Sequence, residues 1–280
     1  MKQIVFAAVL TLTATMSFGQ SNKGANIQLI RNATVVFRYA GHEFLIDPML
    51  AERGAYPGFP GTANLRNPLV ALPVAVDGLL HPDAIFVSHL HPDHWDEAAI
   101  KMLPKEIPLF AQDEKDAMVI KSKGFIDVRV LSKSSNFKNV AIQKTAAQHG
   151  SDEAYKNPQM AAALGDASGF FFSSPGQKSV YFVGDAIWTD AFEKALKALK
   201  PDVVVLNTGF AQVDGFGAII MGKDDVKKIN KILPDAIIIA IHMEAINHCI
   251  LTRKELGDYV ANLGIATKVF IPLDGEVIKL

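Results

Sequence analysis

The chain has 280 residues, of which 49% are hydrophobic and 20% are charged, and its formal net charge is −1. This composition is typical of a globular protein and excludes a disordered chain, while the near-zero charge gives no basis for binding nucleic acid. Its only cysteine, Cys249, cannot form an internal disulfide, so stability must come from the core or from a bound metal.

The first 19 residues have the pattern of a secretory signal. Lys2 precedes an apolar run over residues 4–16, and Ser17-Phe18-Gly19 places small residues before Gln20. The run is shorter than the roughly 18 to 20 apolar residues of a spanning helix, which disfavours the alternative of an uncleaved anchor. We therefore predict a signal peptide at 1–19, cleavage after Gly19, and an exported protein, periplasmic or secreted, without a stable membrane anchor. Residues 20–280 are interpreted as a single domain.

The start of the mature chain alternates strand-forming runs with turns. Successive antiparallel strands are predicted at 27–30, 34–39 and 43–46. Residues 52–69 are rich in glycine, proline and asparagine and predict a long loop, which we expect to shape a pocket.

The remainder follows a strand, loop and helix pattern. Further strands are predicted at 84–87, 140–145, 179–183, 203–206, 236–241, 269–272 and 277–280, and helices at 95–103, 190–199, 224–233 and 244–261. Asp274-Gly275 predicts a hairpin turn between the last two strands. Strand pairs at both ends, with strand–helix units between them, favour two mixed sheets covered by helices.

The most informative segment is His89-Leu90-His91-Pro92-Asp93-His94, directly after the strand 84–87. It holds three of the 8 histidines of the chain and an aspartate, and these are ligands that zinc, iron and manganese accept. A straight strand cannot aim all four side chains at one point, because adjacent side chains diverge. We predict that the strand ends at Ser88, bends at Pro92 and enters a helix with Asp93 as its N-cap. The bend would let His89 and His91 face one metal while Asp93 and His94 face another.

Three further candidates lie just after predicted strands. His149 follows 140–145, Asp185 follows 179–183 and His242 follows 236–241, and α/β folds build their sites at such strand ends. Taken singly, a histidine there is more often structural, and Gly184-Asp185 is often only a turn. Together with the first cluster, all three are predicted to be metal ligands.

These motifs resemble the metallo-β-lactamase superfamily in its broad hydrolase sense. His89 to His94 matches the signature His-x-His-x-Asp-His in full, and His149-Gly150, Gly184-Asp185 and His242 follow in the same order. The resemblance runs from about Asn32 to the C-terminus, and Leu45-Ile46-Asp47-Pro48 also resembles the ascorbate-6-phosphate lactonase-like branch. It implies an α/β fold, a four-layer αββα sandwich of two mixed β-sheets flanked by helices. It also implies two divalent metal ions, with zinc favoured over manganese or iron.

The resemblance also implies roles for individual residues. His89, His91 and His149 would hold the first metal, Asp93, His94 and His242 the second, and Asp185 would bridge them. The true β-lactamases of the superfamily lack this aspartate. Some of them use a cysteine ligand, a role we do not give to Cys249 because it falls in a predicted helix. Antibiotic hydrolysis is therefore not implied.

Two metals a few ångströms apart can lower the pKa of a shared water from 15.7 to about 7. The metal-bound hydroxide then attacks a carbonyl or phosphoryl centre, and Asp93 is the catalytic candidate to orient it and accept its proton. His248 is the candidate proton donor, since a helix over 244–261 would pair it with Glu244 four residues earlier. Asp47 has two readings, as a partner of a ligand histidine or as a strand-end turn. His42 and His81 are given no role.

The predicted function is an exported, dinuclear metal-dependent hydrolase of an ester, lactone, amide or phosphodiester, acting on a small-molecule substrate. Two alternatives remain open: an iron-dependent oxidoreductase or dioxygenase on the same scaffold, and a non-catalytic metal-binding protein. The lactonase-like branch suggests a phosphorylated sugar lactone, but an exported enzyme would meet few such metabolites, so this substrate is not adopted. The sequence does not indicate the oligomeric state.

Overall fold

The computed structural model of the protein describes residues 24–59 and 65–280. The predicted signal peptide, 1–19, lies outside the described residues, so export stays a prediction. Within the described ranges, no helix has the length and apolar character needed to cross a membrane.

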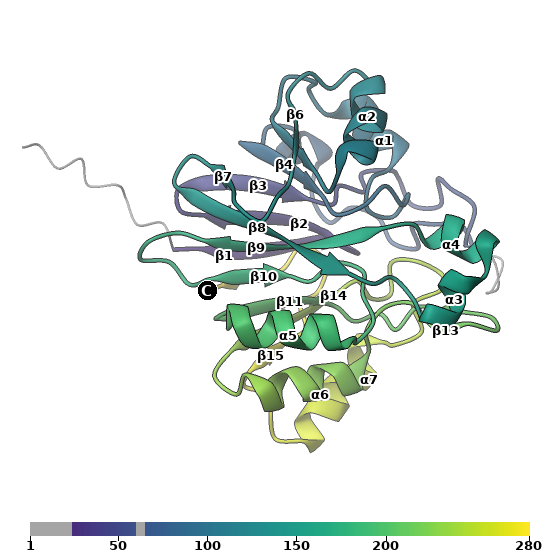
Figure 1. The fold of residues 1–280 in the computed structure, drawn as a ribbon, viewed down its shortest axis with the longest axis vertical. Coiled ribbons are helices and arrows are strands. Elements are labelled where there is room, and N and C mark those ends of the chain that lie inside the picture. Colours follow the sequence, from purple (N-terminus) through teal and green to yellow (C-terminus); the bar gives the residue numbers. More distant parts are fainter. Residues whose placement is uncertain (1–23, 60–64) are drawn as a thin grey trace, which may run out of the picture.

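The two main sheets of the described chain have seven strands each and lie face to face (Figure 1). The first has the order β16-β1-β2-β3-β4-β5-β6, formed by β1 (Asn26–Arg31), β2 (Thr34–Tyr39), β3 (His42–Ile46), β4 (Ala84–Val87), β5 (Leu109–Ala111), β6 (Val128–Val130) and β16 (Val277–Lys279). The second has the order β15-β14-β11-β10-β9-β8-β7, formed by β7 (Ser135–Phe137), β8 (Val140–Ala147), β9 (Ala167–Ser173), β10 (Val180–Phe182), β11 (Val203–Asn207), β14 (Ile237–Ile241) and β15 (Val269–Phe270). A small hairpin pairs β12 (Gln212–Val213) with β13 (Gly217–Ala218).

Both large sheets are mixed, as predicted. In the first, β16, β1, β2 and β3 are antiparallel neighbours, and β3 to β6 are parallel. In the second, β7 to β10 are antiparallel neighbours, and β10, β11, β14 and β15 are parallel. Since β8 and β10 both run antiparallel to β9, the carboxyl ends of β8, β10, β11 and β14 all lie at the same edge of the second sheet.

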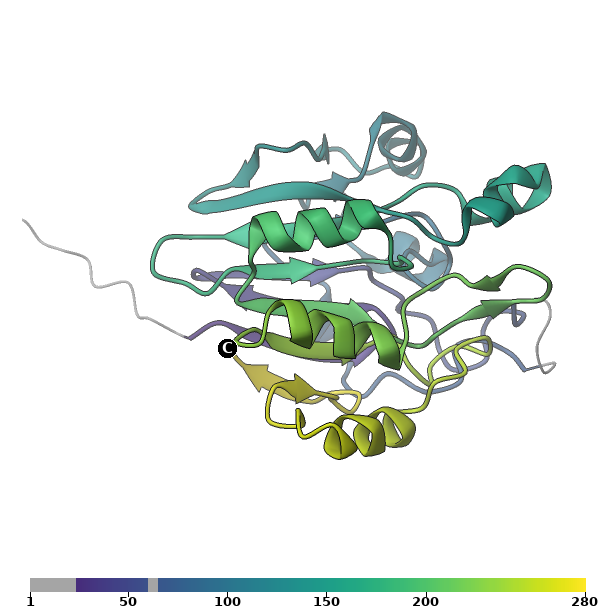
Figure 2. The same ribbon diagram turned by 60° about the horizontal axis from the view of Figure 1, so that its bottom comes forward.

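Helices cover the outer face of each sheet. α1 (Glu97–Met102) and α2 (Glu114–Ser122) cover the first sheet, while α5 (Asp190–Leu199), α6 (Lys223–Ile232) and α7 (Arg253–Asn262) cover the second (Figures 1 and 2). Two short helices, α3 (Asp152–Lys156) and α4 (Pro158–Leu164), lie at one end of the sandwich (Figure 1). The 3₁₀ helix η1 (Val76–Leu79) precedes β4. The predicted four-layer αββα fold is confirmed.

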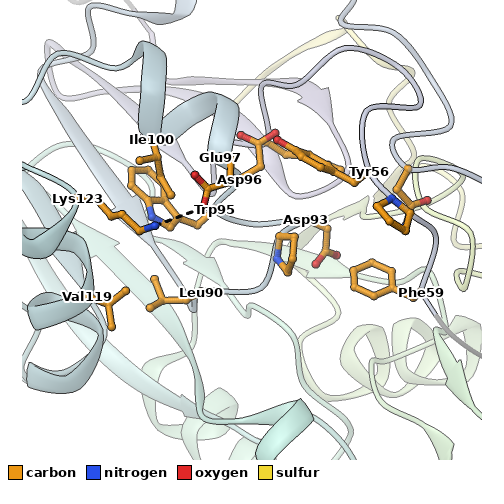
Figure 3. Close-up of a pocket in the computed structure, with 14 residues that line it drawn as sticks. Tyr56, Phe59, Leu90, Asp93, Trp95, Asp96, Glu97, Ile100, Val119 and Lys123 are labelled. Carbon is orange, nitrogen blue, oxygen red and sulfur yellow. Dashed lines mark hydrogen bonds and ion pairs between the residues drawn. The ribbon is translucent and has the colours of Figure 1, made fainter.

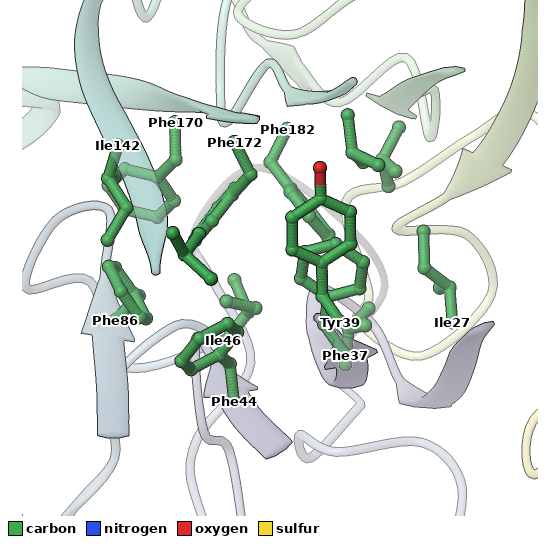
Figure 4. Close-up of a cluster of buried hydrophobic side chains, with 14 of the residues drawn as sticks. Ile27, Phe37, Tyr39, Phe44, Ile46, Phe86, Ile142, Phe170, Phe172 and Phe182 are labelled. Carbon is green, nitrogen blue, oxygen red and sulfur yellow. The ribbon is translucent and has the colours of Figure 1, made fainter. Parts of the chain in front are cut away.

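The layers follow from the period-two alternation of the strands. In β11, Val203 and Val205 enter the core between the sheets, whereas Val204 and Leu206 pack under the helices. Both faces of β11 are buried, which explains why its first four residues are all apolar. Phenylalanines from both sheets fill the space between them (Figure 4), and the rings of Phe86 and Phe172 lie 5.1 Å apart.

Three predicted details are wrong. Asp93 is not the N-cap of the first helix: Asp96 is, and its carboxylate accepts a hydrogen bond from the backbone N–H of Ala99. The helix predicted over 244–261 begins only at Arg253, because Glu244 has a φ of 61° in the left-handed region, which no α-helix contains. Asp274-Gly275 is a turn but joins no hairpin, since β15 belongs to the second sheet and β16 to the first.

Candidate metal centre

All seven predicted ligands lie at one end of the sandwich, beyond the ends of strands. His89, His91, Asp93 and His94 follow β4 of the first sheet, whereas His149, Asp185 and His242 follow β8, β10 and β14 of the second. They form two groups, within each of which the ligand atoms lie within 4.8 Å of one another: His89, His91 and His149, and Asp93, His94, Asp185 and His242. Both sheets contribute to each group. This division agrees with the one that the resemblance implied.

The nitrogen and oxygen atoms of the second group are spaced as the ligands of one cation would be. The Nε2 atoms of His94 and His242 lie 3.1 Å apart, and Asp93 Oδ2 is 3.7 Å from the first and 3.2 Å from the second. Ligands about 2.0–2.1 Å from a tetrahedral zinc ion lie about 3.3 Å from one another. The side chains therefore fit a divalent cation without rearrangement.

Asp185 reaches both groups. Its Oδ2 lies 3.3 Å from His94 Nε2 in the second group, and 3.6 Å from His149 Nε2 and 4.0 Å from His89 Nε2 in the first. Its Oδ1 accepts a hydrogen bond of 2.6 Å from Asn207 Nδ2 at the end of β11. The carboxylate thus has the position that a ligand shared by two cations would need.

Each candidate histidine has one ring nitrogen held by a neighbour, which leaves the other for the cluster. Four histidines are held through Nδ1: His89 by Ser88 Oγ (3.0 Å), His94 by Asp47 Oδ2 (2.8 Å), His149 by the Ile219 carbonyl (2.9 Å) and His242 by Cys249 Sγ (3.4 Å). His91 is held through Nε2, which lies 2.9 Å from the Ala163 carbonyl. Such support is typical of metal-ligating histidines. His89 Nε2 is buried without a hydrogen-bond partner among the described residues, as expected of an atom placed to bind a cation.

The electrostatics of the cluster also favour a cation. Burial alone would raise the pKa of Asp185, but His94 and His242 hold it well below its ordinary value. Burial alone would lower the pKa of His94, yet Asp185, Asp93 and Asp47 raise it to about 10. Burial lowers the pKa of His149 to about 4, so this imidazole is neutral, the form that binds metals. The carboxylates are therefore ionised beside a protonated His94, and a divalent cation would take the place of the proton on this ring.

Several supporting residues were missed by the sequence reasoning. Asn32, in the turn between β1 and β2, donates from Nδ2 to Asp93 Oδ2 at 3.3 Å, and the same nitrogen lies 3.2 Å from His242 Nε2. Asn207 supports Asp185. Of the two readings of Asp47, the structure favours the partner role, since its carboxylate contacts both His94 and Ser88. Asn32 and Asp47 have φ values of 55° and 46°, a conformation that asparagine and aspartate tolerate better than most residues.

A cavity of about 290 Å³ opens beside the cluster. Its polar wall comprises His91, Asp93, His149, Asp185, Gln212 and His248, and the remaining wall is apolar, formed by Phe59, Pro92, Met160, Ala163, Leu164, Val213 and Ile219. Within the part of the chain that the structure describes, no lysine or arginine lines it. The cavity is at the lower limit of ordinary small-molecule sites.

His248 lies in this cavity but not as predicted. The predicted pairing with Glu244 is wrong, because Glu244 forms an ion pair of 2.6 Å with Arg253 Nη1. His248 instead packs against the ring of Phe59, with centroids 4.4 Å apart, and its Nδ1 is buried without a partner among the described residues. Burial lowers the pKa of His248, so the ring is neutral at pH 7.

A second cavity, of about 470 Å³, adjoins the first. Phe59, Pro92 and Asp93 line both cavities, and Tyr56, Leu90, Trp95, Ile100 and Val119 line only the second. Figure 3 shows the ring of Phe59 beside Asp93 at one end of this cavity, with Trp95, Ile100 and Val119 toward the other. Phe59 therefore forms part of the border between the two cavities.

Three nearby or chemically notable side chains lie outside the two ligand groups. Cys249 contacts His242 only through Nδ1, the ring nitrogen that faces away from the ligand group. Trp188 packs against Phe192 and donates to Glu193 rather than lining either cavity. His42 contacts Asn139, at 2.8 Å.

The chain is similar to several known proteins over most of its length. Residues 42–243 match the model of the beta-lactamase superfamily domain. The UPF0173 protein YddR of Bacillus subtilis (strain 168) is 43% identical over 254 residues, which cover 90% of this chain and 98% of the relative. Isothiocyanate hydrolase from Delia radicum gut bacteria, whose crystal structure is known, has 50% sequence identity and a TM-score of 0.89, and the match covers 91% of this chain and 99% of that one. A possible metal-dependent hydrolase from Veillonella parvula DSM 2008, also known from a crystal structure, has 42% sequence identity and a TM-score of 0.90. That match covers 92% of this chain and 100% of the other.

Proposed function

The chain belongs to the metallo-β-lactamase superfamily and is a metal-dependent hydrolase, and from this premise we propose that it is a dinuclear enzyme for small, uncharged, electrophilic substrates. The observation that carries the proposal is the position of Asp185, within 4.0 Å of histidines from both ligand groups. In this proposal His89, His91 and His149 would hold one cation, Asp93, His94 and His242 would hold the other, and the Asp185 carboxylate would serve both. Zinc suits this set of nitrogen and oxygen donors.

Two bound cations would supply an acidified water and positive charge for a developing oxyanion. Side chains of the protein would orient the attacking water and accept its proton. Asp93 is ionised, lines the cavity and accepts a hydrogen bond from Asn32, so it can hold the attacking water and take its proton. His248 is neutral and lines the same cavity, and it can donate a hydrogen bond to the reacting group.

The cavity supports an uncharged substrate. Anionic groups such as phosphate are usually bound by arginine, lysine or a helix N-terminus, and no lysine or arginine of the described residues lines this cavity. Phosphodiesters and phosphorylated lactones are therefore disfavoured, while neutral esters, lactones, amides and isothiocyanates fit the apolar wall.

Isothiocyanates are the first substrates to test, because the 50% identical relative is an isothiocyanate hydrolase. Water would add across the C=N bond of R–N=C=S, with its proton passing to nitrogen. The resulting thiocarbamic acid would break its C–N bond to leave an amine and carbonyl sulfide. The test is a panel of isothiocyanates, esters, lactones, amides and phosphodiesters with metal-loaded protein. Turnover of phosphodiesters alone would contradict the substrate proposal.

Purified protein is expected to hold about two divalent ions per chain, because the structure presents two ligand groups. Elemental analysis after mild purification measures the content. As a control, chelated protein should regain about two ions per chain when zinc, manganese or iron is added back. A reproducible content near zero, without uptake on addition, would eliminate the proposed centre.

Replacing His248 by alanine is expected to lower kcat at least about tenfold and to change KM less, because a donor to the reacting group is lost. His248→Gln should retain part of the activity, since its amide can still donate a hydrogen bond. Steady-state kinetics of both variants at constant metal content test this. A normal kcat in His248→Ala would remove His248 from the mechanism.

A further inference from the structure

Phe59 occupies a defined place although it belongs to a long loop. Asn247 accepts a hydrogen bond of 2.9 Å from the Phe59 N–H, and its side-chain amide donates to the Phe59 carbonyl at 2.9 Å. Asn67 donates from Nδ2 to Asn247 Oδ1 at 2.9 Å, and the Asn247 N–H donates back to Asn67 Oδ1 at 3.0 Å. Two amide side chains 180 residues apart therefore fix the backbone at Phe59.

The neighbouring glycine shows how closely this segment is held. A Cβ atom at Gly58 would lie 2.1 Å from the Leu65 carbonyl oxygen and 2.7 Å from Asn247 Nδ2. No other residue type fits there without moving the backbone. The ring of Phe59 then packs edge to face against His248, with centroids 4.4 Å apart. The surrounding chain therefore fixes the position of the Phe59 ring at the cavity border.

This border separates a small cavity from a larger one. The cavity at the ligand cluster has about 290 Å³. The one beyond Phe59 has about 470 Å³, and its wall includes the rings of Tyr56 and Trp95 together with the charged side chains Asp96, Glu97 and Lys123. Ligand cavities typically range from about 300 to 1,000 Å³. The first alone therefore suits a reacting group with a small substituent, whereas the two joined would accept an arylalkyl substituent.

We infer that Phe59 is a specificity-determining residue: its ring keeps the substituent of the substrate out of the larger second cavity and so limits that substituent to a small apolar group. This inference rests on the proposed function, because it assumes that the reacting group lies at the cation cluster. The Asn67–Asn247 pair acts through Phe59 as a positioning element.

Binding of hydroxamic acids tests the inference without relying on turnover. Cobalt-loaded protein is titrated with acetohydroxamic acid and with 3-phenylpropanehydroxamic acid, and visible absorption reports each Kd. The two probes share one metal-binding group, so the ratio of their Kd values reports only how the substituent affects binding. We expect Phe59→Ala to shift this ratio at least about tenfold in favour of the phenyl probe, equivalent to about 1.4 kcal/mol. Asn247→Ala should shift it in the same direction.

Phe270→Ala is the matched control, because Phe270 is a partly exposed phenylalanine of β15 that lines neither cavity. It should leave the ratio unchanged. An unchanged ratio in Phe59→Ala, with both probes bound, overturns the inference and leaves the proposed function standing. Failure of the cobalt-loaded wild type to bind either probe overturns both.

Discussion

His91→Ala is expected to abolish measurable hydrolysis and to remove one of the two cations while the protein stays folded. His91 is one of only three histidines in the first ligand group, and its ring is partly exposed, so the core does not depend on it. Its loss would leave His89 and His149 without their third nitrogen donor. Metal content should fall to about one ion per chain, and circular dichroism should match the wild type.

His81→Ala provides the control for this substitution. His81 is exposed and belongs to neither ligand group, so both activity and metal content should remain at wild-type values. If His91→Ala retained wild-type turnover, the proposed two-cation mechanism would be abandoned.

Asp185→Asn is expected to lower turnover at least about tenfold and to reduce occupancy of the second cation. Asparagine has nearly the same shape, but it removes the negative charge and one good oxygen ligand. Asp185 Oδ2 contacts His94 and His149, one from each group, so the two cations would lose their common partner. Substrate affinity should change less than kcat, because the loss falls on the charged transition state.

The same substitution at the exposed Asp235 serves as the control, since this carboxylate lies outside the cluster. It should leave metal content and kcat unchanged. Normal metal content together with normal turnover in Asp185→Asn would mean that Asp185 only forms the turn after Gly184. The proposal that Asp185 serves two cations would then be withdrawn.

The candidate ligands could be named from the sequence because most of the information about them is local. His89 to His94 lie in one short segment, and a strand that ends before a cluster of polar residues indicates a site at a sheet edge. His149 and His242 were found by the same rule, applied to the strands that precede them. The pairing of ligands with individual cations came from the family resemblance, and the geometry is consistent with it.

The supporting residues could not be predicted, because their roles depend on contacts between distant parts of the chain. Asn32 was expected only to form a turn. The strand order of the first sheet brings its amide to Asp93, and the packing of the two sheets brings it to His242. Asn207 ends an apolar strand without any distinctive pattern. The Asn67–Asn247 pair joins two loops, and neither loop has a periodicity that would indicate its partner.

The segment after His242 shows where local propensity misled the prediction. Residues 244–252 contain good helix formers, yet Glu244 takes a left-handed conformation and pairs with Arg253 instead of continuing into a helix. The helix begins at Arg253, where Thr252 and Glu255 form a capping box that the sequence reasoning overlooked. The resulting loop brings His248 to the cavity and Asn247 to Phe59.

The division of the ligands between two sheets links metal supply to the lifetime of the protein. Each ligand group draws on both layers, so an unfolded chain or a separated layer presents only part of it. A cation that binds only the assembled sandwich stabilises it by about 4 kcal/mol at a free concentration of 1,000 times its Kd. Under metal starvation this contribution is lost, and the chain opens more often to proteases. Starved protein would thus be degraded faster as well as being inactive, so the amount of protein would follow the metal supply.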